Sequence, residues 1–127
     1  LCGIGHDTIT KDLTLWASPA MTLTQLRSTE RKTKWIKDEM ERRLWLADKW
    51  FAQIQSAEPK LRDKLKSMTD CMVVFLNYRE KYYGIVSKND KIVLETALLQ
   101  YNASAVRSKL TEYKTWWTKN KENAINL

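Results

Sequence analysis

The sequence predicts an all-α fold: a three-helix antiparallel bundle with an irregular N-terminal arm, in a single domain over residues 1–127. Apolar residues recur every three or four positions through three long stretches, which is the spacing of one helix face. Short polar breaks separate these stretches and favour antiparallel neighbours. Only three glycines and two prolines occur in 127 residues, which is few for a turn-rich β fold.

The two ends of the chain are predicted to be irregular. Residues 1–20 form the arm, because they contain Gly3, Gly5 and Pro19 and show no sustained periodicity. Residues 119–127 are polar, and we expect them to form a frayed tail.

The first helix is predicted over residues 22–55. Thr22 and Gln25 have the spacing of a capping box, in which a hydroxyl and an amide satisfy free backbone N–H groups. Asp48 falls on the apolar arc of this helix, where an unpaired carboxylate would be costly. The arc is formed by Ile36, Met40, Leu44, Ala47, Phe51 and Ile54, and is widened by Trp35, Trp45, Leu46 and Trp50.

The second helix is predicted over residues 58–83, and Gly84 supplies the left-handed residue that ends many helices. Arg79 lies on its apolar stripe, so it must reach water or meet an acid. Asp48 is the obvious candidate, and we predict a structural ion pair between Asp48 and Arg79 that fixes the register of the two helices. The stripe consists of Leu61, Leu65, Met68, Met72, Phe75, Arg79 and Tyr82.

The third helix is predicted over residues 89–118. Ser87 and Asn89 are both plausible caps at its start. Its stripe consists of Ile92, Leu99, Ala103, Val106, Leu110, Tyr113 and Trp117, and is broadened by Leu94, Leu98 and Ala105.

The chain lacks the motifs of phosphate-binding loops, dinucleotide-binding folds, zinc proteases and serine hydrolases. His6 and Asp7 lie close to Cys2, but a lone histidine near a terminus is most simply a solvated side chain. Cys2 and Cys71 permit one disulfide, although Cys71 adjoins the core stripe and is better explained as a small buried thiol. We therefore expect no enzyme, no catalytic residue, no metal site and no cofactor.

Charge and aromatic residues provide the only candidate partner surface. The formal net charge is +7, from 22 basic and 15 acidic residues, and no run approaches the roughly 18 apolar residues of a membrane span. A protein partner is favoured. Nucleic acid, bound by phosphate contacts and base stacking, is the alternative. The candidate contact residues are Arg27, Arg31, Lys32, Lys34, Trp45, Lys114, Trp116 and Lys119.

Three short motifs resemble those of the LprI-type lysozyme inhibitors, small extracytoplasmic helical domains of bacteria. They are Ala47-Asp48 with Phe51-Ala52, then Phe75 with Tyr78-Arg79-Glu80, and last Ser104 with Arg107 three residues later. The resemblance covers about half the chain, and Tyr83 stands where the second motif of the family has a cysteine. It implies a helical fold, a location outside the cytoplasm, and structural roles for Asp48 and Arg79.

Together these features favour a non-catalytic helical protein-binding module, an inhibitor-like protein acting outside the cytoplasm. One alternative is a small basic intracellular protein of phage or viral type that binds nucleic acid or a host factor. Another is a self-assembling structural protein, with Trp45 and Trp116 at the contact. The sequence leaves the oligomeric state open.

Overall fold

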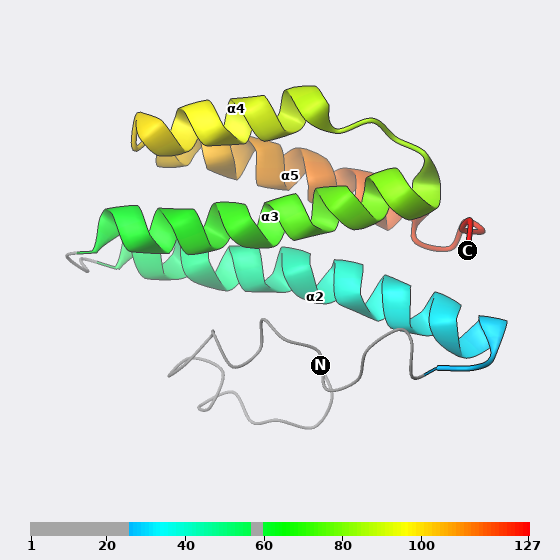
Figure 1. Ribbon diagram of the computed structural model, residues 1–127. Coiled ribbons are helices and arrows are strands. Elements are labelled where there is room, and N and C mark those ends of the chain that lie inside the picture. Colours follow the sequence, from blue (N-terminus) through cyan, green and yellow to red (C-terminus); the bar gives the residue numbers. More distant parts are fainter. Residues whose placement is uncertain (1–25, 57–59) are drawn as a thin grey trace.

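The computed structural model describes residues 26–56 and 60–127 of the chain. These ranges form four α-helices and contain no β-strand: α2 (Thr29–Gln55), α3 (Leu61–Tyr83), α4 (Lys88–Leu99) and α5 (Ala103–Asn120) (Figure 1). The all-α prediction is confirmed for these ranges, whereas the predicted helix count of three is wrong. The arm predicted over residues 1–20 lies outside the described residues.

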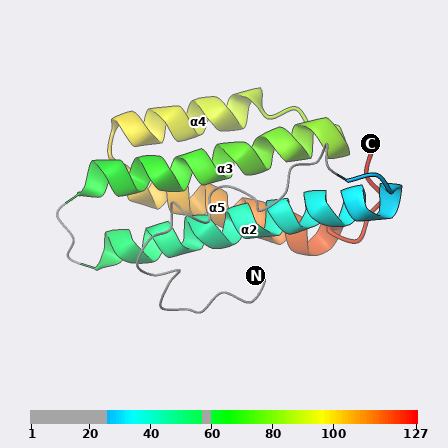
Figure 2. The same cartoon turned by 60° about the horizontal axis from the view of Figure 1, so that its bottom comes forward.

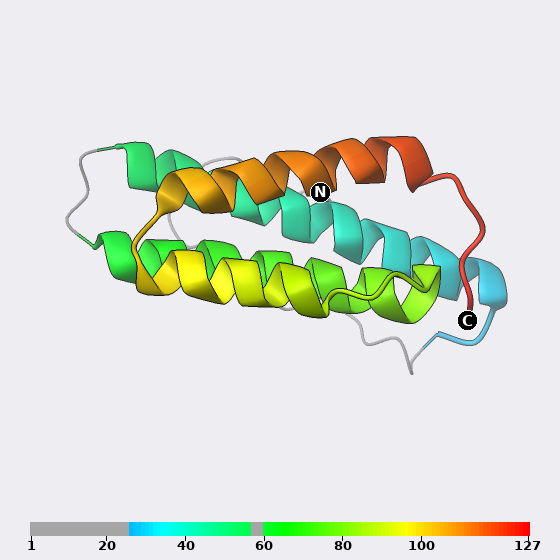
Figure 3. The same cartoon turned by 90° about the horizontal axis from the view of Figure 1, so that it is seen from above.

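Each helix runs antiparallel to the one before it (Figure 1, Figure 2). The most extensive contact joins α2 and α3, while α4 packs on α3 and α5 packs on both α2 and α4. Seen from above, α4 lies over α3 and α5 lies over α2, which makes two layers of two helices (Figure 3). The apolar faces of all four helices therefore point toward one core.

The core consists mainly of the side chains that the helical periodicity places on the inner faces. Burying each large one stabilises the fold by about 1.5–3 kcal/mol. Those with no exposed area are Ile36, Met40, Leu46, Ala47, Leu65, Met68, Met72, Phe75, Leu76, Val106 and Leu110.

The third predicted helix is broken into α4 and α5 at residues 100–102. Tyr101 has a left-handed backbone conformation, with φ 53°, and the Asn102 N–H donates to the Ala97 carbonyl at 2.8 Å. The Asn102 side chain then accepts a hydrogen bond from the Ala105 N–H at 3.1 Å, which caps the start of α5. Left-handed residues at helix ends are usually glycine or asparagine. A tyrosine at position 101 therefore gives no signal in the sequence that a helix ends there.

This break changes which face of α4 is buried. Ile92 and Leu99, predicted to be in the core, are 51% and 76% exposed, whereas Leu94 is buried as predicted and Ala97 is buried beside it. Because α4 has its own axis, its inner face need not continue the stripe of α5. Two predicted core residues thereby become surface residues.

Two helix starts differ from the prediction, and one end confirms it. Helix α2 starts at Thr29, where the Ser28 hydroxyl accepts from the Arg31 N–H at 3.1 Å and so caps it, and the capping box predicted at Thr22 and Gln25 lies outside the described residues. Helix α3 starts at Leu61 rather than residue 58, and residues 57–59 lie outside the described ranges. Its predicted end is confirmed, since Gly84 has φ 69° and its N–H donates to the Glu80 carbonyl.

The C-terminal tail is docked rather than frayed. Helix α5 continues to Asn120, and the chain then returns to the other helices. The Asn126 N–H donates to the Tyr82 carbonyl at 2.9 Å, and Lys37 Nζ donates to the Asn123 carbonyl at 2.9 Å. The prediction of a frayed tail is therefore wrong, because these contacts join it to α2 and α3.

Candidate functional site

The predicted ion pair between Asp48 and Arg79 does not form, because each residue faces a different helix. Asp48 on α2 faces α5, where its two carboxylate oxygens pair with Arg107 at 3.2 Å and Lys114 at 2.6 Å. Arg79 on α3 faces α4, where its Nη2 lies 3.6 Å from Asp90 Oδ2. Sequence periodicity correctly indicated that Arg79 is buried but assigned it the wrong acid.

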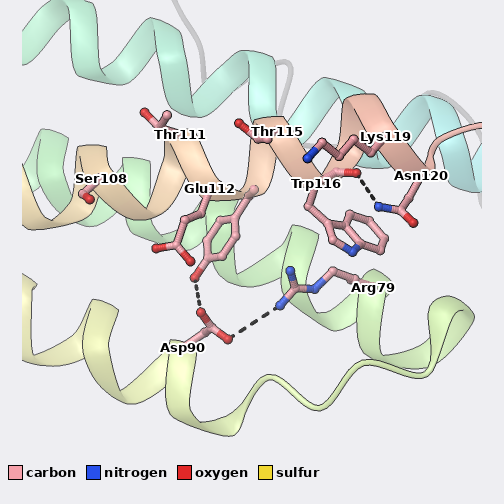
Figure 4. A pocket seen from close by; sticks show the side chains of 10 residues that line it. Arg79, Asp90, Ser108, Thr111, Glu112, Thr115, Trp116, Lys119 and Asn120 are labelled. Carbon is pink, nitrogen blue, oxygen red and sulfur yellow. Dashed lines mark hydrogen bonds and ion pairs between the residues drawn. The ribbon is translucent and has the colours of Figure 1, made fainter.

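Arg79 lies at the base of a cleft of about 700 Å³ between the first turn of α4 and residues 108–120 of α5 (Figure 4). One turn after another of α5 lines the far wall. The lining residues are Arg79, Asp90, Ser108, Thr111, Glu112, Tyr113, Thr115, Trp116, Lys119 and Asn120.

The Arg79 side chain is enclosed by aromatic rings and is only 7% exposed. The guanidinium carbon lies 5.3 Å from the ring centroids of both Tyr113 and Trp116, a distance that permits cation–π attraction. Among the described residues the guanidinium has no hydrogen-bond acceptor, and its Nε is buried without a partner. The 3.6 Å contact with Asp90 is an ion pair, too long for a hydrogen bond.

Asp90 connects the helices on either side of the cleft. Its Oδ1 accepts hydrogen bonds from the Tyr113 hydroxyl at 3.0 Å and from Lys109 Nζ at 3.3 Å. Burial and the negative charge of Asp90 raise the pKa of Tyr113 well above its ordinary value. Burial lowers the pKa of Lys109, but its hydrogen bonds to Asp90 and Glu112 raise it overall. Both donors therefore hold their protons at neutral pH.

Trp116 belongs to the aromatic cluster behind the cleft. Its ring meets Tyr83 edge-on, with centroids 5.0 Å apart, and meets Phe75 in the same way at 6.2 Å. It also stacks on Trp117 at 6.4 Å. Trp116 is thus half-buried and braced by neighbouring rings, rather than the free surface aromatic that we predicted.

Of the residues predicted to contact a partner, only Trp116 and Lys119 line this cleft. Arg27 and Arg31 are exposed beside the start of α2, Lys32 is half-buried, and Lys34 pairs with Asp38. The ring of Trp45 is covered by Lys49, whose Nζ lies 5.1 Å from the ring centroid, and Lys114 is bound to Asp48. The structure therefore does not bring this set together in one site.

A buried polar cluster lies between α2 and α3 and was not predicted from the sequence. Glu39 is 3% exposed, pairs with Arg42, and accepts hydrogen bonds from Arg43 at 3.1 Å and from the Tyr78 hydroxyl at 3.2 Å. Burial and the charge of Glu39 raise the pKa of Tyr78 to about 12. Burial also raises the pKa of the nearby Cys71 thiol to about 11. Glu39 lies within a strongly charged stretch of sequence, so no local pattern marks it as buried.

A second surface feature is the outer face of α4. Large apolar side chains are exposed here and at both ends of the helix, although the inner face of α4 is apolar as well. We call this set the α4 outer face; it consists of Val86, Ile92, Val93, Leu99 and Tyr101, which are between 41% and 77% exposed.

Comparison of the chain with protein-family models, with curated proteins and with solved structures produced no match. The resemblance to LprI-type inhibitors thus rests on the three short motifs alone. None of the four described helices is long and apolar enough to cross a membrane. Within the described ranges, no group of three or more His, Cys, Asp or Glu side chains could hold a metal ion.

Proposed function

We propose that the protein is a non-catalytic helical module that binds another protein through the α4 outer face. The observation that carries this proposal is the exposure of Ile92 and Leu99, at 51% and 76%, on a helix whose opposite face is already packed in the core. These positions are seven residues apart and lie on the same side of the helix. Gathered apolar side chains of this kind mark surfaces that a partner covers.

The cleft supports a non-catalytic role. Tyr113 in its wall and Lys109 beside it both have raised pKa values and donate hydrogen bonds to Asp90. A general acid must instead release its proton, and a general base accept one, near the working pH. An inhibitor-like protein outside the cytoplasm is one form that a non-catalytic binding module would take.

Nucleic acid is the less favoured partner because acids already engage many of the basic side chains. Arg107 and Lys114 pair with Asp48, and Lys66 pairs with Asp70. A polynucleotide must displace such pairs before its phosphates gain the same contacts, and the α4 outer face offers it mainly hydrocarbon.

Photo-crosslinking in the native host tests the proposal. A crosslinking amino acid in place of Ile92 or Leu99 should capture a specific protein, because both side chains project outward from α4. The matched control positions are Asn77 on α3 and Ser104 on α5, which are also exposed but polar. We expect the captured band at the α4 positions and not at the controls.

A pair of double variants gives the complementary result. Ile92→Lys with Leu99→Lys should abolish capture by a crosslinker at Val93 and leave the melting temperature almost unchanged, because exposed positions contribute little to stability. Asn77→Lys with Ser104→Lys adds the same charge elsewhere and should preserve capture. Equal capture at all positions would contradict the proposal, as would a steeply salt-dependent nanomolar affinity for single-stranded RNA or DNA. A crosslinked product of twice the chain mass would favour self-assembly instead.

A further inference from the structure

We propose that the cleft between α4 and α5 binds a small organic carboxylate, which Arg79 receives through its guanidinium group. The inference is independent of the α4 outer face, since it concerns a different surface and a different class of ligand. It rests on the unsatisfied donors of Arg79, the charge balance of the cleft and the hydroxyl groups along its wall.

Arg79 has donors that the described part of the protein does not use. A guanidinium carries five N–H groups; the Nε–H of Arg79 is buried without an acceptor, which is costly, whereas its two Nη groups are open to the cleft. Arg79 is 7% exposed and makes no hydrogen bond among the described residues. Its nearest carboxylate, Asp90, is 3.6 Å away and already accepts from Tyr113 and Lys109. A ligand carboxylate would supply the acceptors that are missing.

The guanidinium is held in place for such a contact. Tyr113 and Trp116 each lie 5.3 Å from its central carbon, and Trp116 is itself braced by Tyr83. The end of the Arg79 side chain lines the cleft, whereas its Nε is enclosed (Figure 4). A planar, fixed guanidinium binds a carboxylate with two parallel hydrogen bonds at little additional entropic cost.

The charges in and beside the cleft favour a single negative charge on the ligand. Arg79, Lys109 and Lys119 are positive, and Asp90 and Glu112 are negative, which leaves one net positive charge. A carboxylate would neutralise this charge. A doubly charged phosphate would exceed it and be repelled by the two acids.

The remaining walls describe the body of the ligand. Ser108, Thr111 and Thr115 line the cleft from successive turns of α5, and the Trp116 ring supplies apolar surface. The Thr111 hydroxyl already donates to the Arg107 carbonyl at 3.1 Å, so it offers a ligand only its acceptor lone pairs (Figure 4). The volume of about 700 Å³ lies in the usual range for small-molecule sites. A compact acid with an apolar or aromatic body and hydrogen-bonding groups would fit this lining.

Nuclear magnetic resonance of the full chain tests the proposal, with sodium benzoate as the probe. The reporters are the Arg79 Nε–H and Trp116 indole N–H signals, assigned with Arg79→Lys and Trp116→Phe variants. We expect saturable shifts with benzoate at constant pH and ionic strength, and none with benzamide, its neutral counterpart. Inorganic phosphate should shift the same signals at least about tenfold less at equal concentration, because of the two acids.

Variants distinguish the contribution of Arg79 to benzoate binding from that of the residues around it. Arg79→Lys keeps the charge but loses the two-pronged geometry, and should weaken benzoate binding about tenfold or more. Lys119 lies on the exposed rim of the cleft, so Lys119→Gln should weaken benzoate binding only a few-fold. Asn77→Gln on α3 and the Ile92→Lys, Leu99→Lys pair should leave benzoate binding unchanged, which distinguishes this proposal from that of the α4 outer face.

The carboxylate could belong to a free acid or to the C-terminus of a peptide, and a second titration separates these sources. A short peptide with a free C-terminal carboxylate is compared with its C-terminal amide. Tighter binding of the free-acid peptide than of benzoate would indicate a peptide terminus, and the reverse a free acid. Equal shifts by benzoate and benzamide, or benzoate shifts that never saturate, would overturn the proposal without any variant needing to fold.

Discussion

Replacing Asp90 with asparagine should destabilise the fold more than any surface charge change. Asp90 is 22% exposed, lies 3.6 Å from the buried Arg79, and accepts hydrogen bonds from Tyr113 and Lys109. Asp90→Asn keeps the shape and one acceptor but removes the negative charge. Arg79 would then remain buried without a counter-ion, and removing one partner of a fully buried pair costs about 3–5 kcal/mol.

The expected cost here is somewhat smaller, about 2–3 kcal/mol, because Asp90 is partly solvated and the contact is long. In urea unfolding, with a slope of about 2 kcal/mol per molar, this corresponds to a midpoint lowered by about 1–1.5 M. Circular dichroism at 222 nm follows the transition directly, since the described fold is helical.

The matched control is Asp70→Asn, which removes a carboxylate that is 61% exposed and pairs with Lys66. This exposed pair is screened by water, so the urea midpoint of Asp70→Asn should stay close to that of the parent protein. A double-mutant cycle with Arg79→Met then isolates the interaction between Asp90 and Arg79. The double variant should lose at least about 1 kcal/mol less unfolding free energy than the sum of the two single variants. If Asp90→Asn unfolds at the same urea concentration as Asp70→Asn, the electrostatic account of Arg79 is wrong.

Four further predictions follow from single features. Tyr101→Asn should raise the free energy of unfolding by up to about 1 kcal/mol in urea, because asparagine tolerates the left-handed backbone at φ 53° better than tyrosine; a loss would show that the Tyr101 ring matters more. Gly84→Ala should lower it by about 1 kcal/mol, since a Cβ meets nothing within 4 Å and only the backbone strain at φ 69° remains. The raised pKa of Tyr113 means that the folded chain holds this proton more tightly than the unfolded chain. The resulting stability is fully present below pH about 10 and is lost above it by up to about 1.4 kcal/mol per pH unit. Urea unfolding at pH values from 9 to 11 should therefore show that the free energy of unfolding falls less steeply with pH in Tyr113→Phe than in the parent protein. In a Cys2→Ser variant, the buried Cys71, whose pKa is raised to about 11, should react with a thiol reagent at pH 8 only after unfolding, and rapid reaction of the folded chain would contradict that burial.

The residues of the candidate site could be predicted only in part. Arg79 was recognisable because it interrupts an apolar stripe, and the structure places it among buried residues. Its neighbours were not recognisable, because Asp90 approaches Arg79 only after the chain has turned at Gly84 and again into α4. Asp48 satisfies the same sequence criterion and faces α5 instead. Which acid meets a buried cation depends on the offset and crossing of helices, and neither is encoded in local spacing.

The sequence by itself determined the helical class, the inner faces of α2, α3 and α5, and the end of α3. Periodicity and the conformational freedom of Gly84 are local properties that any packing must respect. Tertiary structure alone decided that residues 100–102 form a turn, that the α4 outer face is exposed, and that the tail docks on α2 and α3. Each of these depends on contacts between residues far apart in the chain. Tyr101, for example, remains in its left-handed conformation only because the packing of α4 against α3 and α5 outweighs the local preference of tyrosine.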